Sequence, residues 1–141
     1  SAGLGALRLL VPRRGDIEDW LRPVLFADER TRTAFELVAA QPDLHAALQD
    51  APTASAELLH RLAVEESAAD IADVVVRLSQ EAVSRMIQRL GREASVSDDP
   101  LSFEPSLRWL KLQQEALAGE VVPPEVLTTV IDWLGEHGTD S

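Results

Sequence analysis

The chain has 141 residues, a net charge of −11 and no cysteine, which excludes disulfides, thiolate zinc sites and a cysteine nucleophile. Hydrophobic residues make up 45% of the chain, enough for a core, and aromatic residues only 4%, so the aliphatic composition favours packed helices over a β-domain. The excess of negative charge argues against a primary nucleic-acid surface, which needs a cationic stripe, and suits protein partners.

The N-terminal part of the chain begins with two short apolar segments that are separated by prolines. The first predicts a helix over residues 5–11 that stops at Pro12. The second predicts a helix over residues 16–23, with Asp16 as its N-cap and Pro23 at its end. Two separate short helices are therefore expected before the first longer one.

The next segment combines a capping residue with an apolar face at helical spacing. Asp28 is a good N-cap, because its carboxylate can accept hydrogen bonds from the free backbone N–H groups of the first turn. The apolar residues after it recur at helical spacing, which predicts a helix over residues 28–41. Similar but shorter patterns predict helices over residues 43–50 and 56–66.

The longest uninterrupted helical pattern covers residues 68–92. Its apolar positions step by three or four residues and form one stripe, which consists of Ile71, Val75, Leu78, Ala82, Met86 and Leu90. A helix of this length measures roughly 35 Å, more than a compact bundle of this size needs. We therefore expect it to be the spine of the fold or to project from it.

The C-terminal part follows a polar segment that contains two prolines. Pro105 suits the first turn of a helix over residues 104–117, because the N–H group that proline lacks would be unpaired there. A last helix is expected over residues 124–137. The whole pattern predicts an all-α chain with three parts: a helical bundle that includes the long helix in residues 1–92, a linker in 93–103 and a hairpin-like helical unit in 104–141.

No arrangement of residues in the sequence is typical of a catalytic or metal site. The histidines are His45, His60 and His137, and none of them has the short helical spacing of a metal site or stands in an HExxH pattern. The sequence has no glycine-rich phosphate loop and no histidine and acid pattern around a serine or threonine. We therefore expect no enzyme activity in this chain, no cofactor and no bound metal.

Two groups of residues remain as candidates for binding. One is a basic cluster near the N-terminus, formed by Arg8, Arg13, Arg14 and Arg22. Acidic residues beside it nearly cancel its charge, which favours a solvated turn over a phosphate site. The other is Trp109 and Trp133, which are either packed in the interior or exposed for a partner, since tryptophan is enriched at interaction hot spots.

The stretch "GALRLLVPRRGDIEDWLRPVLFADERTRTAFELVA" resembles the start of the C-terminal domain of bacterial DNA primases of the DnaG type. Those domains begin with a leucine-rich run, a basic residue beside proline, a short helix that ends in Leu, and a Phe-x-Asp-Pro-x-His-Arg-x-x-Phe segment. The matching residues here are Leu7, Leu9 and Leu10, then Pro12 and Arg13, then Trp20 and Leu21, and last Phe26 to Phe35.

A second match and two departures complete the resemblance. The stretch "AELLHRLAVEES" at residues 56–67 is similar to the LLxRLAxEE helix of the same domains. Glu29 stands where the family usually has Pro, and Thr31 where a His is common. The resemblance covers residues 4–92 well and the remainder in outline, and it consists of packing patterns without a catalytic signature.

The resemblance implies a non-catalytic domain that docks on the N-terminal domains of the hexameric replicative helicase (DnaB type), and so recruits and regulates primer synthesis at the replication fork. The zinc-binding and polymerase domains of the primase would lie upstream, outside this chain. The family's helical bundle is followed by a terminal helical hairpin that makes the helicase contact. We therefore expect the helicase-contacting residues here to be Trp109, Leu112, Trp133 and Leu134.

Two other functions stay open at this stage. The chain can be an unrelated all-α adaptor or regulatory subunit, or a nucleic-acid module that binds single-stranded DNA through the basic cluster with strong salt dependence. Little direct nucleic-acid binding is expected from the overall charge. The sequence lacks a run of ~20 apolar residues, which a bilayer span requires, and has no signal-peptide pattern. A cytoplasmic location at the replisome, with no membrane partner, is therefore expected.

Overall fold

The computed structural model describes residues 2–41, 44–64 and 70–137, and all regular structure in these ranges is helical, which confirms the expected all-α fold. The expected helix boundaries between residues 65 and 69 lie outside these ranges, as do residues 138–141. The elements in chain order are α1 (Ala2–Ile17), the 3-10 helices η1 (Glu18–Trp20) and η2 (Pro23–Leu25), α2 (Glu29–Ala40), α3 (Leu44–Asp50), α4 (Thr53–Val64), α5 (Ile71–Ser95), the 3-10 helix η3 (Pro100–Phe103), α6 (Glu104–Leu117) and α7 (Pro124–His137).

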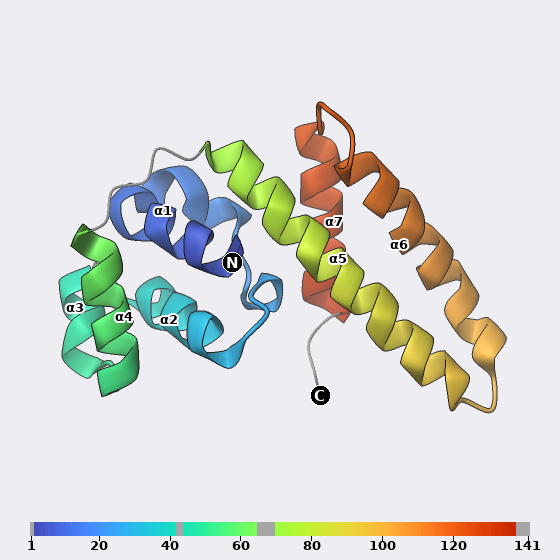
Figure 1. The fold of residues 1–141 in the computed structure, drawn as a ribbon, viewed down its shortest axis with the longest axis horizontal. Coiled ribbons are helices and arrows are strands. Elements are labelled where there is room, and N and C mark those ends of the chain that lie inside the picture. Colours follow the sequence, from blue (N-terminus) through green and yellow to red (C-terminus); the bar gives the residue numbers. More distant parts are fainter. Residues whose placement is uncertain (1, 42–43, 65–69, 138–141) are drawn as a thin grey trace.

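The long helix α5 is the element around which the others are arranged (Figure 1). On one side of it α1 to α4 form a bundle, in which α1 contacts α2, α4 and α5. On the other side α6 runs back along α5 in the opposite direction, and α7 crosses behind and contacts α5, α6 and η2. The long helix is thus the spine of the fold, shared by the bundle and the C-terminal helices.

The sequence of α5 explains its length and its central position. Asp70 caps its start, with Oδ1 accepting a hydrogen bond from the Ala72 N–H at 2.7 Å. The middle of the expected apolar stripe is buried, namely Val75, Leu78, Ala82 and Met86, and the two ends of the stripe are half-buried. Each fully buried Val, Leu or Met side chain contributes roughly 1.5–3 kcal/mol, so this stripe holds a helix of roughly 37 Å in place.

The residues around the N-terminus of α2 form a packed joint between α1 and α2. Asp28 Oδ1 accepts hydrogen bonds from the Thr31 N–H at 2.8 Å and from the Thr31 hydroxyl at 3.0 Å, which confirms the expected N-cap. Phe26 and Phe35 are buried and stack, with ring centroids 4.9 Å apart. Gly3 of α1 lies so close that a Cβ atom there would be 3.3 Å from Thr31 Oγ1 and 3.4 Å from Phe26 Cδ1. The regular aromatic spacing of this segment therefore serves packing.

The expectations for the first two helices are wrong in their boundaries. Helix α1 continues through Pro12 to Ile17, and Asp16 lies in its last turn instead of capping a new helix. A proline inside a helix costs roughly 3 kcal/mol. Ile17, however, lies two turns after Leu10 on the same face, and both side chains are buried. Burial of this face offsets the cost, and the chain that follows forms only the short turns η1 and η2.

The C-terminal helices α6 and α7 have the expected bounds, and Pro105 lies in the first turn of α6. The linker expected over residues 93–103 is mostly helical, because α5 continues to Ser95 and η3 packs against α5. Only residues 96–99 connect the two without helix. The C-terminal helices bury Leu110, Leu117, Val130 and Leu134 in the same core cluster as the bundle. They pack as part of one body with α5.

Replacing Asp28 with Ala removes the N-cap of α2 and is expected to lower the free energy of unfolding by about 1 kcal/mol at pH 7. The Thr31 backbone N–H hydrogen bond lowers the pKa of the Asp28 carboxyl, although partial desolvation opposes this. The contribution of the charge is therefore complete above the ordinary aspartate pKa of about 3.9 and is lost as the pH falls through the lower pKa of the folded state. Urea unfolding between pH 7 and pH 2 should show the difference shrinking only below about pH 4. An Asp28→Asn variant is the control, since Asn caps well but does not titrate.

Ser79 lies on the buried side of α5, and its Oγ has no hydrogen-bond partner among the described residues. A buried hydroxyl without a partner costs roughly 1–3 kcal/mol, so Ser79→Ala is expected to stabilise the fold by about 1 kcal/mol in urea unfolding. Ser84→Ala on the same helix is the matched control, because Ser84 Oγ is half-buried and accepts a hydrogen bond from Gln114 Nε2 at 3.2 Å. Equal changes in the free energy of unfolding for the two substitutions would show that the higher helix propensity of alanine alone causes the stabilisation.

Candidate protein-docking surface

Trp109 of α6 and Trp133 of α7 meet where the two helices pack. Their ring centroids lie 5.1 Å apart with a tilt of 33°. The His137 ring stacks on Trp133 at 4.2 Å, and its Nδ1 lies 2.9 Å from the Trp133 carbonyl oxygen. Both indole rings are half-buried against the core. The result is a row of three rings that crosses the two helices and keeps part of its area exposed.

The four residues expected to contact a partner differ in their exposure. Leu112 is 57% exposed and follows Trp109 by three positions, which places the two on neighbouring parts of one helix face. Leu134 is fully buried in the core. The expectation that Leu134 contacts a partner is therefore corrected, because one step along α7 rotates the side chain by about 100° from the half-exposed Trp133 to the interior. We define the docking face as Trp109, Leu112, Trp133 and His137.

The basic residues near the N-terminus are engaged in intramolecular contacts. Arg14 Nε pairs with Glu18 at 2.9 Å. The Arg14 Nη1 and Nη2 atoms donate to the carbonyl oxygens of Gln41 at 2.6 Å and Ala39 at 3.3 Å, and so satisfy the C-terminal end of α2. Arg22 donates to backbone carbonyls in its own turn. These arginines stabilise the bundle.

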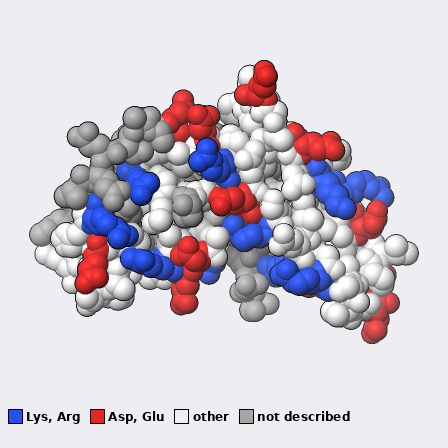
Figure 2. Space-filling view, in the orientation of Figure 1, with Lys and Arg blue, Asp and Glu red and all other residues white. Residues whose placement is uncertain are grey.

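The remaining basic residues of that cluster do not change this conclusion. Arg8 has an interaction partner, and the side chain of Arg13 lies outside the described part of the chain. Figure 2 shows acidic and basic side chains interspersed over the face in view, without the continuous cationic stripe of a nucleic-acid interface. The contacts thus give no support to a single-stranded DNA site at this cluster.

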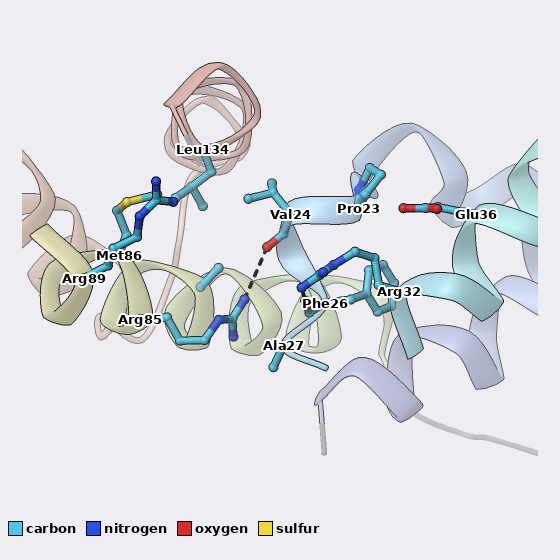
Figure 3. A pocket seen from close by; sticks show the side chains of 11 residues that line it. Pro23, Val24, Phe26, Ala27, Arg32, Glu36, Arg85, Met86, Arg89 and Leu134 are labelled. Carbon is cyan, nitrogen blue, oxygen red and sulfur yellow. Dashed lines mark hydrogen bonds between the residues drawn. The ribbon is translucent and has the colours of Figure 1, made fainter. Parts of the chain in front are cut away.

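A pocket of about 440 Å³ lies between η2, the start of α2, α5 and α7 (Figure 3). Its apolar lining comes from Pro23, Val24, Phe26, Ala27, Ala82, Met86 and Leu134. Three arginine side chains also line it, Arg32 from α2 and Arg85 and Arg89 from α5, together with Glu36. It combines an apolar floor with an excess of positive charge in a chain that is acidic overall.

Arg85 is held by hydrogen bonds to the backbone of η2. It is half-buried, and its Nη2 donates to the carbonyl oxygens of Val24 and Leu25, each at 3.3 Å; Figure 3 shows the first of these bonds. Burial lowers the pKa of Arg85, the nearby Glu81 opposes this shift, and the nearby Arg32 adds to it. The guanidinium still remains charged at all accessible pH values. Arg85 therefore links η2 to α5 through hydrogen bonds, and its positive charge lines the pocket.

The sequence reasoning missed this pocket. The four-residue spacing of Arg85 and Arg89 was a usable indication, because it places two cations on one face of α5. Arg32, Phe26 and Leu134 come from outside α5, so their convergence with Arg85 follows only from the packing of η2 and α7 against α5 and of α2 against η2.

The described ranges contain neither a candidate metal site nor a candidate membrane span. No group of three or more acidic or histidine residues there can hold a metal ion, and no helix there is long and apolar enough to cross a bilayer. His60 and His137 are exposed, and the side chain of His45 is not among those described. No family model, curated protein or solved structure matches this chain. A functional assignment therefore depends on its residues and its fold.

Replacing Arg85 with Met keeps the length of the side chain but removes its donors to η2. We expect the free energy of unfolding to fall by about 1 kcal/mol, because two backbone carbonyls lose a charged hydrogen-bond donor in a half-buried position. Arg77→Met is the matched control on α5, since Arg77 is exposed and should change stability by less than about 0.5 kcal/mol. Equal stabilities of the two variants in urea unfolding would contradict a structural role for Arg85.

Proposed function

We propose that this chain is the helicase-docking C-terminal domain of a bacterial DNA primase of the DnaG type. The observation that carries the proposal is the order of its parts: the bundle α1 to α4, the long helix α5, and the pair α6 and α7. A bundle followed by a terminal helical hairpin is the arrangement that the resemblance over residues 4–92 implies.

The residues that carry the resemblance have clear structural roles. Phe26 and Phe35, the two aromatic ends of the primase-like segment, stack in the joint between α1 and α2, and Asp28 between them caps α2. Leu7, Leu9 and Leu10 of the leucine-rich run are fully buried or nearly so. The residues that match the primase domain are thus core and capping residues of the bundle. This supports the proposal, because the resemblance rests on packing residues.

The docking face suits the proposed contact with the N-terminal domain of the replicative helicase. Trp109 and Trp133 offer aromatic area, and the exposed Leu112 extends it along α6. Both helices pack on α5, so the face is held in a fixed shape before binding, which reduces the entropy lost on association. Aromatic and aliphatic anchors on a rigid support are typical of interaction hot spots.

In this role the domain supplies attachment. The polymerase and zinc-binding domains would belong to the upstream part of the primase, and the present chain would tether them to the helicase. Tethering raises the local concentration of the primase at the fork without any chemistry in this domain.

The test is calorimetric titration of this chain with the N-terminal domain of the replicative helicase from the same organism. Saturable binding is expected, and Leu112→Ala should weaken it by about fivefold or more, because hot-spot truncation costs more than 1 kcal/mol. Leu101→Ala is the matched control, because Leu101 is a leucine that is 78% exposed in η3, outside the docking face. It should leave the affinity within about twofold.

Two outcomes would contradict the proposal. Absence of binding by the folded chain would favour an unrelated all-α adaptor. Equal losses from Leu112→Ala and Leu101→Ala would show that the contact lies elsewhere on the chain.

A further inference from the structure

The pocket between the bundle and the C-terminal helices has an unusual charge balance for this protein. Arg32 and Arg85 extend toward each other from α2 and α5 (Figure 3), and the charge of Arg32 acts on Arg85. Among the described residues neither arginine forms an ion pair with a carboxylate, and the nearest acidic influence on Arg85 is the charge of Glu81. Two like charges therefore lie close together, and no carboxylate of the described residues is ion-paired with either of them.

The two guanidinium groups also keep hydrogen-bond donors that are not used within the fold. Each has five N–H donors. Arg85 uses Nη2 on two carbonyls of η2, and Arg32 uses Nη2 on the Phe26 carbonyl at 3.1 Å. The Nε and Nη1 groups of both have no acceptor among the described residues. The backbone contacts fix the two side chains in place and leave donor edges for an anion.

We propose that this pocket binds an acidic side chain of a protein partner that is flanked by aliphatic residues. A carboxylate accepts two parallel hydrogen bonds from a guanidinium, so one Asp or Glu would neutralise the Arg32 and Arg85 pair. The apolar side chains of Pro23, Val24 and Ala27, which line the pocket and keep exposed area, then accommodate the aliphatic neighbours of that residue. The volume of about 440 Å³ falls in the range of roughly 300–1,000 Å³ that is usual for binding pockets.

The surroundings of the pocket favour a single carboxylate over a polyanion. Glu36 lines the pocket and Glu81 lies close to Arg85, so a nucleic-acid backbone or a polyphosphate would meet negative charge beside the arginines. The net charge of −11 adds repulsion for any polyanion over longer distances. A single carboxylate with apolar neighbours can bind the two arginines, and it carries less negative charge that Glu36, Glu81 and the rest of the chain would repel.

The experiment is an NMR titration of the 15N-labelled full chain with the tripeptide Ac-Leu-Glu-Leu-NH2. The Nε–Hε signals of Arg32 and Arg85 should shift saturably, with a dissociation constant of ~1 mM or below. The peptide Ac-Leu-Gln-Leu-NH2, which differs only in charge, should bind about tenfold more weakly. This test contains no helicase, so its result is independent of the proposed docking function.

Substitutions of arginine residues test whether the Glu peptide binds in the pocket. Arg32→Gln is expected to weaken binding of the Glu peptide by about tenfold, and Arg77→Gln, an exposed position on α5, should leave it unchanged. The amide spectrum of each variant shows whether the chain is folded. Arg32→Lys replaces Arg32→Gln as the test if the latter does not fold, because lysine keeps the charge but cannot form the two parallel hydrogen bonds of a guanidinium, so it should also weaken binding.

Three results would overturn the proposal. Equal binding of the Glu and Gln peptides would show an apolar groove without charge selectivity. Tighter binding of inorganic pyrophosphate than of the Glu peptide would assign the pocket to phosphate compounds. No saturable shift with any of these probes at ~10 mM would show that the pocket binds no carboxylate of this kind.

Discussion

The two-sided burial of α5 is the constraint on which the rest of the structure depends. Its stripe from Val75 to Met86 is covered by α1 on one side and by α6 and α7 on the other. Without the helices that cover it, the apolar stripe of α5 would be exposed to water. Such exposure is unfavourable by about 25 cal/mol for each Å² of apolar area. The bundle and the C-terminal helices therefore share one core and hold each other in position through α5.

At the points where helices end, side-chain N–H groups donate hydrogen bonds to backbone carbonyl oxygens. Gln80 of α5 donates to the Leu117 carbonyl at the end of α6 at 2.7 Å, as Arg14 does for the end of α2 and Arg85 for η2. Such carbonyls have no partner within their own helix. Each of these bonds joins two elements that are distant in sequence, so they fix the relative positions of helices that already pack through apolar contacts.

The rigid support of α5 connects the proposed docking face with the pocket. Trp133 and Leu134 are adjacent on α7, yet the first contributes to the docking face and the second to the floor of the pocket. The two surfaces are therefore built on the same helix and cannot move independently over large distances.

The sequence by itself determined the helical class, the bounds of α6 and α7, the cap at Asp28 and the buried stripe of α5, because these follow from local spacing and local hydrogen bonds.

The sequence could not determine that α1 continues past Pro12, because the burial of Ile17 that offsets the proline depends on contacts with distant residues. The same holds for the two tryptophans, whose burial was left open, and for Leu134, whose side chain is covered only once α7 packs on α5. Tertiary structure also decided the arginine pocket, since Arg32 and Arg85 come together only when η2 packs on α5 and α2 packs on η2. Local sequence patterns specify which residues become helical, whereas the pairing of helix faces decides which side chains remain available for a partner.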